Sequence, residues 1–222
     1  GRTVAELLVR GGTIIDAGES QMTPAVRCVI FSQNETSSSI LDGFTIRNGN
    51  ATGQPGDDTG GGIKINFASP LIKNCIIKNN SAAYGGGAAV IGGRWPKFEN
   101  TIFEDNHATT QGGGFFGDNM SEYYTISFEN CVFRNNSAGP AEFSGKEEMI
   151  YWGGAMALHR AVADLTNVTI AHNTAQNAGA IFKENVGPDD PSPLFIQNSI
   201  IAFNAQPQFY LTHPVRTTVT YS

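Results

Sequence analysis

Apolar and polar residues alternate in short segments that recur along the chain. Aligning the copies gives two apolar columns, Ile72, Phe98, Phe128, Leu165, Ile196 and Ile77, Phe103, Phe133, Ile170, Ile201. A polar column directly follows the first of them, Lys73, Glu99, Glu129, Thr166, Gln197. Alternation with a period of two is typical of strands that bury one face. The pattern therefore predicts a set of short, half-buried β-strands that share one core.

Asparagine fills two further columns of the same repeat. They contain Asn74, Asn100, Asn130, Asn167, Asn198 and, six residues later, Asn80, Asn106, Asn136, Asn173, Asn204. Asparagine tolerates left-handed backbone and hydrogen-bonds locally, so we expect both columns to hold tight bends. Stacked asparagines can also hydrogen-bond from one layer to the next. The spacing between first-column asparagines is 26, 30, 37 and 31 residues, which favours a solenoid with insertions in its loops.

Two short strands and a bend-rich third side per repeat predict an all-β fold, a single-stranded parallel β-helix of about seven layers. We expect one domain over residues 1–222, with irregular N-terminal layers or a cap at 1–39, regular repeats at 40–205 and a last layer at 206–222. Glycine-rich starts such as Gly153–Met156 alternate with FxxN motifs, as in Phe103–Asn106. This pairing resembles the repeats of polymorphic outer membrane proteins and the right-handed parallel β-helix superfamily, which includes pectate lyases. The resemblance implies a right-handed helix and an extracellular or cell-surface location.

Composition narrows the classes of partner. Only 15% of the 222 residues are charged and the net charge is -6, which argues against a nucleic-acid partner because that would need a basic stripe. The sequence contains no run of 18 apolar residues, so it predicts no transmembrane segment. We expect Cys28, Cys75 and Cys131 to be buried free thiols, since Cys75 and Cys131 are two layers apart, roughly 9.6 Å, and a disulfide spans less than about 7 Å.

Acidic residues are candidate metal ligands or catalytic groups. The resemblance to the β-helix superfamily implies that a lyase of this fold would hold calcium with carboxylates on its strand faces. The column expected to face outward after the glycines contains no acid: Lys64, Ala89, Phe116, Met156, Ile181. The pairs Asp57–Asp58 and Asp189–Asp190 are candidate calcium ligands, although turn-rich loops often contain aspartate. No other cofactor is expected. The columns Glu99, Glu129 and Lys78, Glu104, Arg134 are typical of a solvated charged face.

Two groups of residues are candidates for a site. His159 and Arg160, with Asp164 nearby in sequence, could move a proton or bind an acidic sugar, or they could be structural. Trp95 precedes one strand, and Tyr123 and Tyr124 precede the equivalent strand one repeat later. These three could form an exposed platform that stacks on sugar rings, or they could cover the base of a loop.

These patterns favour a non-catalytic extracellular or cell-surface module of structural or adhesive kind, with a polysaccharide or surface glycan as its partner. The alternative is a polysaccharide lyase or glycoside hydrolase of the same fold. The C-terminal segment, residues 216–222, is β-branched and strand-like, and an uncovered sheet edge is ready to pair. We expect either that the sequence belongs to a longer repeat protein or that copies pair end to end into filaments.

Overall fold

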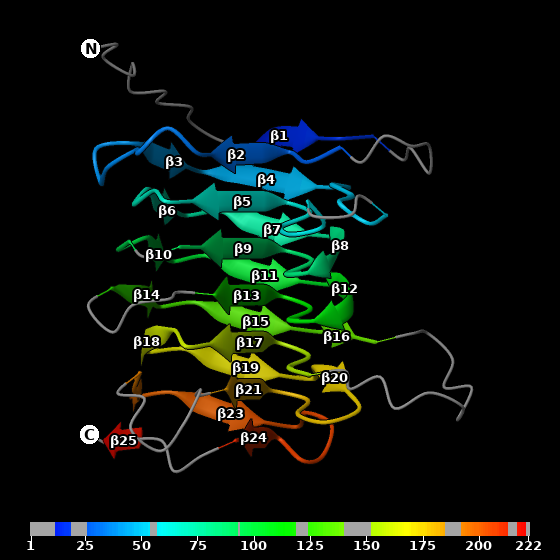
Figure 1. Cartoon of the computed structure of the whole chain (residues 1–222), viewed down its shortest axis with the longest axis vertical. Coiled ribbons are helices and arrows are strands. Elements are labelled where there is room, and N and C mark those ends of the chain that lie inside the picture. Colours follow the sequence, from blue (N-terminus) through cyan, green and yellow to red (C-terminus); the bar gives the residue numbers. More distant parts are fainter. Residues whose placement is uncertain are drawn as a thin grey trace.

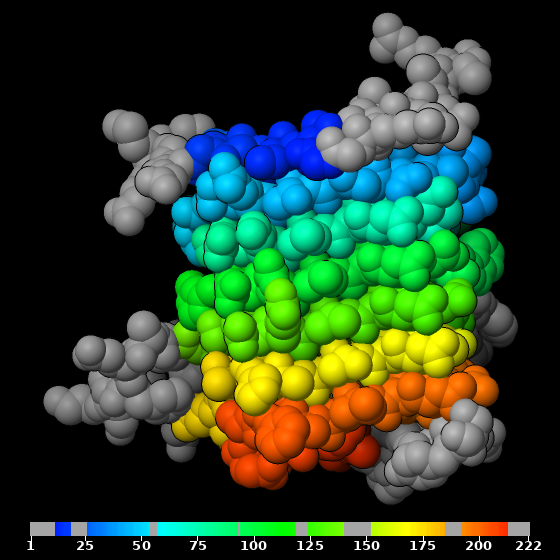
Figure 2. Space-filling view, turned by 180° about the vertical axis from the view of Figure 1, so that it is seen from behind, coloured from blue at the N-terminus to red at the C-terminus, as the bar shows by residue number. Residues whose placement is uncertain are grey.

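The computed structural model is a column of stacked turns in which the named strands pair only in parallel (Figure 1). It describes residues 12–18, 26–53, 57–92, 94–118, 124–139, 152–184 and 192–212, and the backbone of 217–220. The turns follow one another from the N-terminal to the C-terminal end, and Figure 2 shows them as successive bands. This arrangement is the parallel β-helix that the repeats predict. No helix in the described residues is long and apolar enough to cross a membrane.

Two seven-stranded sheets contain the segments that the apolar columns predict. Sheet A consists of β1 (Thr13–Asp16), β4 (Phe44–Arg47), β7 (Ile76–Lys78), β11 (Ile102–Glu104), β15 (Val132–Arg134), β19 (Thr169–Ala171) and β23 (Ile200–Ala202). Sheet D consists of β3 (Ile40–Asp42), β6 (Leu71–Lys73), β10 (Lys97–Glu99), β14 (Thr125–Glu129), β18 (Val162–Thr166), β22 (Leu194–Gln197) and β25 (Thr217–Thr220). Each of these two sheets therefore contributes one strand to each of seven layers.

The side expected to be rich in bends contains two more sheets, so the prediction of only two strands per turn was wrong. Sheet C consists of β2 (Val29–Phe31), β5 (Ile63–Asn66), β9 (Ala88–Ile91), β13 (Phe115–Asp118), β17 (Met156–His159), β21 (Ile181–Glu184) and β24 (Phe209–Leu211). Sheet B consists of β8 (Ser81–Tyr84), β12 (His107–Gln111), β16 (Ser137–Ala138) and β20 (Thr174–Ala175). The glycine-rich starts lead directly into sheet C.

The core lies inside the column, where the predicted apolar columns meet. Phe103 pairs in register with Ile77 on one side and Phe133 on the other. Its ring stacks on that of Phe133 at 4.4 Å, and the ring of Phe98 stacks on that of Phe128 at 5.0 Å. Burying a phenylalanine side chain contributes roughly 1.5–3 kcal/mol. The register predicted for these columns is confirmed.

The two asparagine columns have different roles. Residues of the first column adopt left-handed backbone, as predicted; for example, φ is 48° at Asn100. The second column does not, because the residue before each asparagine adopts that conformation instead, as at Asp105 and Asn135 with φ of 54° and 55°. The prediction of a bend at the second column was therefore displaced by one residue. The bend residue faces solvent, and the asparagine that follows it is directed into the core.

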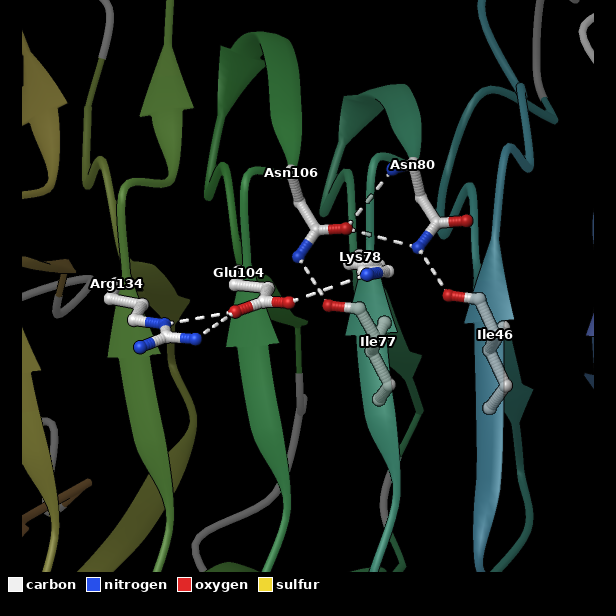
Figure 3. Close-up of polar contacts among 7 residues, drawn as sticks. All are labelled: Ile46, Ile77, Lys78, Asn80, Glu104, Asn106 and Arg134. Atoms are coloured by element: carbon white, nitrogen blue, oxygen red, sulfur yellow. Dashed lines mark hydrogen bonds and ion pairs between the residues drawn. The ribbon is translucent and has the colours of Figure 1, made fainter. Parts of the chain in front are cut away.

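This second column forms a buried ladder of side-chain amides. Asn106 Nδ2 donates to Asn136 Oδ1 at 3.0 Å and to the carbonyl oxygen of Ile77 at 2.8 Å. Asn106 Oδ1 accepts from Asn80 Nδ2 at 3.0 Å (Figure 3). The same pattern continues through the later asparagines and ends at Asn204, whose Nδ2 donates to Gln208 Oε1 at 3.2 Å. Each rung joins two turns, which confirms the predicted bonding between layers.

The outward column of sheet C differs from its prediction in register and in burial. A left-handed glycine lies three residues before each of two strands, Gly112 with φ of 69° before β13 and Gly153 with φ of 67° before β17, and the strands align from these glycines. Phe116 consequently pairs with Ala157 and not with Met156, which pairs with Phe115. The side chains of this outward column are also buried, because they pack into a second apolar cluster on the outer face of sheet C. That cluster consists of Ala89, Phe116, Ala157, Ala178 and Phe182.

The outer face of sheet A carries the predicted charge ladder. Glu104 lies 3.8 Å from Lys78 Nζ and also pairs with Arg134 (Figure 3). The three cysteines are free thiols, as predicted, and Cys75 and Cys131 are buried. Cys28 is only partly buried, contrary to the prediction, because it precedes β2, the first strand of sheet C, at the N-terminal end of the column. Burial raises the pKa of Cys75 to about 11 and that of Cys131 to about 12, so both thiols are protonated at neutral pH.

Candidate functional site

Aromatic side chains gather where the chain passes from sheet C to sheet D. Phe67 follows β5, Trp95 precedes β10 and Tyr124 precedes β14, so three successive turns each supply one aromatic residue. Phe67 is 52% exposed and Trp95 is 56% exposed. Phe67 and Trp95 are exposed and Tyr124 is partly buried, and because single exposed apolar side chains are common, it is their grouping along one edge of the solenoid that makes them a candidate site. We call Phe67, Arg94, Trp95 and Tyr124 the aromatic corner.

The backbone holds this corner in place. Phe67 has φ of 51°, which is uncommon for a bulky residue. Its ring lies against Gly92, where a Cβ atom would come within 2.5 Å of the ring. Arg94 Nε donates to the carbonyl oxygen of Phe67 at 3.2 Å, and the Trp95 N–H donates to Ser69 Oγ at 3.2 Å. The exposed rings therefore project from a fixed backbone.

Trp95 and Tyr124 come together as the sequence suggests. Their ring centroids are 4.7 Å apart and the rings meet edge to face at 75°. This geometry is favourable for aromatic pairs, and it leaves the indole of Trp95 exposed to solvent. Tyr123, the third predicted member, lies outside the described residues. Phe67 and Arg94 were not predicted. A phenylalanine at the end of a strand resembles a core residue in the sequence pattern, and Arg94 has no counterpart in the repeat.

A cluster of ionisable side chains lies further along the outer face of sheet C. The register places Asp118, His159 and Glu184 at equivalent positions of three successive strands. His159 Nδ1 contacts a carboxylate oxygen of Glu184, and its Nε2 contacts Gln111 Oε1. The imidazole also lies between two phenylalanine rings, 5.2 Å from that of Phe116 and 5.4 Å from that of Phe182. We call Gln111, Asp118, His159, Arg160 and Glu184 the His159 cluster.

Burial sets the charge state of this histidine. It lowers the pKa of His159, and the carboxylates of Glu184 and Asp118 oppose the shift only in part. An imidazole that is neutral at neutral pH has the protonation state of a general base. Arg160 lies beside it, with Nη2 3.3 Å from Asp118 Oδ1.

The structure places His159 and Arg160 beside the same pair of acidic residues, and it places Asp164, the third candidate, on a different sheet. Asp164 lies on β18 in sheet D, where it accepts a hydrogen bond of 3.1 Å from Thr166 Oγ1 of the same strand. Asp118 and Glu184 take its place in the cluster, although the expected outward column contained no acid. They lie two positions beyond that column and on the same face of the sheet.

Asp57, one of the candidate calcium ligands, is paired with basic side chains. Asp57 Oδ2 is 2.9 Å from Arg27 Nη1, and the same carboxylate pairs with Lys64. Burial opposes the shift, but the hydrogen bond from Lys64 and the charge of Arg27 hold the pKa of Asp57 below its ordinary value. A cation bound there would have to displace two basic side chains. In the described part of the chain, no three His, Cys, Asp or Glu side chains are grouped as metal ligands. Asp189 and Asp190 lie outside that part.

The acidic column of sheet D is bridged by a lysine. Lys97 Nζ lies 2.5 Å from Glu99 Oε1 and 2.9 Å from Glu129 Oε2. Glu99 and Glu129 together raise the pKa of Lys97. This is the solvated charged face that the sequence predicts, and exposed pairs of this kind contribute about 0–1 kcal/mol each.

Comparison with known proteins concerns the whole column of turns. A family model described as a right handed beta helix region matches residues 11–200. Comparison with curated proteins and with solved structures found no match.

Proposed function

Because the chain belongs to the right-handed β-helix family, we propose that it is a non-catalytic, saccharide-binding module that acts outside the cell or on its surface. Function does not follow from this fold alone, so the proposal is carried by one site. The observation behind it is the exposed indole of Trp95, held against Tyr124. Support for an extracellular location comes from the resemblance of the repeats to those of polymorphic outer membrane proteins.

The aromatic corner suits a sugar chain that runs parallel to the solenoid axis. Turns are spaced about 4.8 Å apart, so Phe67, Trp95 and Tyr124 offer apolar contacts along a line. Sugar rings present apolar C–H faces, and burying an aromatic side chain against them is favourable. Because the backbone at Phe67 and Trp95 is already fixed, binding orders few additional groups. A rigid, repeated surface of this kind is typical of an adhesive module.

A glycan array followed by calorimetry on the best ligand tests this role. Trp95→Ala should weaken binding at least about tenfold, which corresponds to about 1.4 kcal/mol. Phe203→Ala is the matched control, since Phe203 is 79% exposed and follows β23 at the edge of sheet A. It should leave affinity unchanged, and both variants should melt like the parent. The proposal fails if no glycan binds, if Trp95→Ala binds as well as the parent, or if the two substitutions weaken binding equally.

The His159 cluster favours a second candidate function, a polysaccharide lyase or glycoside hydrolase. Asp118 and Glu184 are separated by two layers, roughly 9.6 Å, and paired carboxylates about 6.5–9.5 Å apart serve inverting glycosidases. Their contacts weigh against this role, because Asp118 pairs with Arg160 and Glu184 with His159. One measurement separates the two functions: an enzyme would release new chain ends from a bound glycan, and a binding module would not. Cleavage that Glu184→Gln abolishes while binding persists would favour the enzyme.

A further inference from the structure

Arg94 differs from the other arginines of the described residues in lacking an acidic partner. Four of them pair with carboxylates: Arg27 with Asp57, Arg47 with Asp16, Arg134 with Glu104 and Arg160 with Asp118. Arg94 contacts only neutral acceptors, through Nε to the carbonyl oxygen of Phe67 and through Nη2 to Asn34 Oδ1, each at 3.2 Å. The chain carries a net charge of -6, so acidic partners are not scarce. The uncompensated cation lies in the aromatic corner.

These two hydrogen bonds orient the guanidinium of Arg94 and leave three of its N–H donors for a ligand. An arginine side chain carries five N–H donors, and two of the Arg94 donors are used here. The remaining donors suit the oxygens of a carboxylate or sulfate, which arginine often binds through two parallel bonds. Because the side chain is already held against Phe67 and Asn34, little rotamer entropy is lost when an anion arrives.

The position of Arg94 relates the charge to the proposed stacking surface. It precedes Trp95 directly, and its bond to Phe67 spans two successive turns. A sugar ring placed on Trp95 would therefore present its substituents close to the guanidinium. The acidic chain as a whole repels polyanions, so one fixed cation beside the rings gives selectivity where the ligand binds.

We propose that Arg94 makes the aromatic corner selective for saccharides that carry an anionic group, a carboxylate or a sulfate ester. The inference rests on the proposed function, since it assumes that sugar rings stack on Trp95. It assigns a specificity role to a side chain that the repeat pattern does not single out.

Three hexasaccharides with one backbone provide the test: unsulfated chondroitin, chondroitin sulfate, and carboxyl-reduced, unsulfated chondroitin, which is neutral. Calorimetry with the parent should show at least about tenfold tighter binding of an anionic probe than of the neutral one. Arg94→Gln should remove that difference and leave the neutral probe unaffected. Arg134→Gln is the matched control, because it changes the net charge equally but lies on sheet A, and it should retain the difference. The two anionic probes show whether the carboxylate or the sulfate is recognised.

The outcomes separate the two proposals. Equal binding of all three probes, lost in Trp95→Ala, would overturn the role of Arg94 and leave saccharide binding intact. Preference for an anionic probe that survives in Arg94→Gln, or that disappears equally in Arg134→Gln, would also overturn it. If no probe binds the parent, the proposal that Arg94 selects anionic saccharides is overturned. Binding that is the same in Trp95→Ala and in the parent would contradict the proposed function itself.

Discussion

Removing one rung of the asparagine ladder should destabilise the whole column. The side chain of Asn106 is 1% exposed and takes part in four hydrogen bonds, two donated by Asn80 and two that it donates to Asn136 and Ile77. At about 1 kcal/mol of net stability for each bond, Asn106→Ala should lower the free energy of unfolding by roughly 4 kcal/mol. That is a large fraction of the roughly 5–15 kcal/mol that stabilises a typical domain.

Urea unfolding followed by circular dichroism measures this loss. Asn100→Gly is the control, because Asn100 belongs to the exposed column and its φ of 48° is one that glycine adopts readily. Its side chain takes part in only two hydrogen bonds, both of 3.2 Å. We expect a change within about 1 kcal/mol, since exposed groups exchange their bonds with water. If Asn106→Ala were no more destabilising than Asn100→Gly, the ladder would not be a main source of stability.

Three further predictions concern the core, pH and assembly. Phe103→Ala should lower stability by roughly 3–5 kcal/mol through the cavity it leaves, and a loss under about 1 kcal/mol in the same urea assay would contradict the register of sheet A. Burial depresses the folded-state pKa of His159, so stability should fall as pH drops below the ordinary value of 6.5, and His159→Gln should flatten that part of a melting profile. An unchanged profile would show that Glu184 and Asp118 offset burial. End-to-end pairing remains a prediction; electron microscopy of concentrated protein should show fibres with a layer repeat of about 4.8 Å, whereas monomers across salt and pH would exclude it.

The fold could be predicted from sequence because its signal is local and repeated. Alternation between apolar and polar residues identifies the strands, and the recurrence of Ile77, Phe103 and Phe133 identifies the register of the core. The buried ladder could be predicted for the same reason, since Asn106 has a counterpart in each neighbouring turn. What repetition does not reveal is which residue takes the strained backbone. Asp105 has a left-handed φ although aspartate is not the repeated residue there.

The candidate site could be predicted only in part, because it depends on residues that do not repeat. Trp95 stood out as an aromatic residue in a loop, but Phe67 was concealed by the strand before it. Asp118 and Glu184 lie beyond the glycine-rich starts, whose register is set by left-handed residues and not by the last glycine in each run. Counting from the wrong glycine displaced later strands by one position. Insertions of different length between the repeats removed any second check on that alignment.

A crystal structure of the protein with a bound anionic hexasaccharide tests the central claim most directly. The account predicts a sugar ring against the indole of Trp95, an anionic group within hydrogen-bond distance of Arg94, and a chain that runs along the axis toward Phe67 or Tyr124. A saccharide bound elsewhere on the column, with the aromatic corner empty, would contradict the account. Binding over Asp118 and His159 in particular would favour the enzymatic alternative.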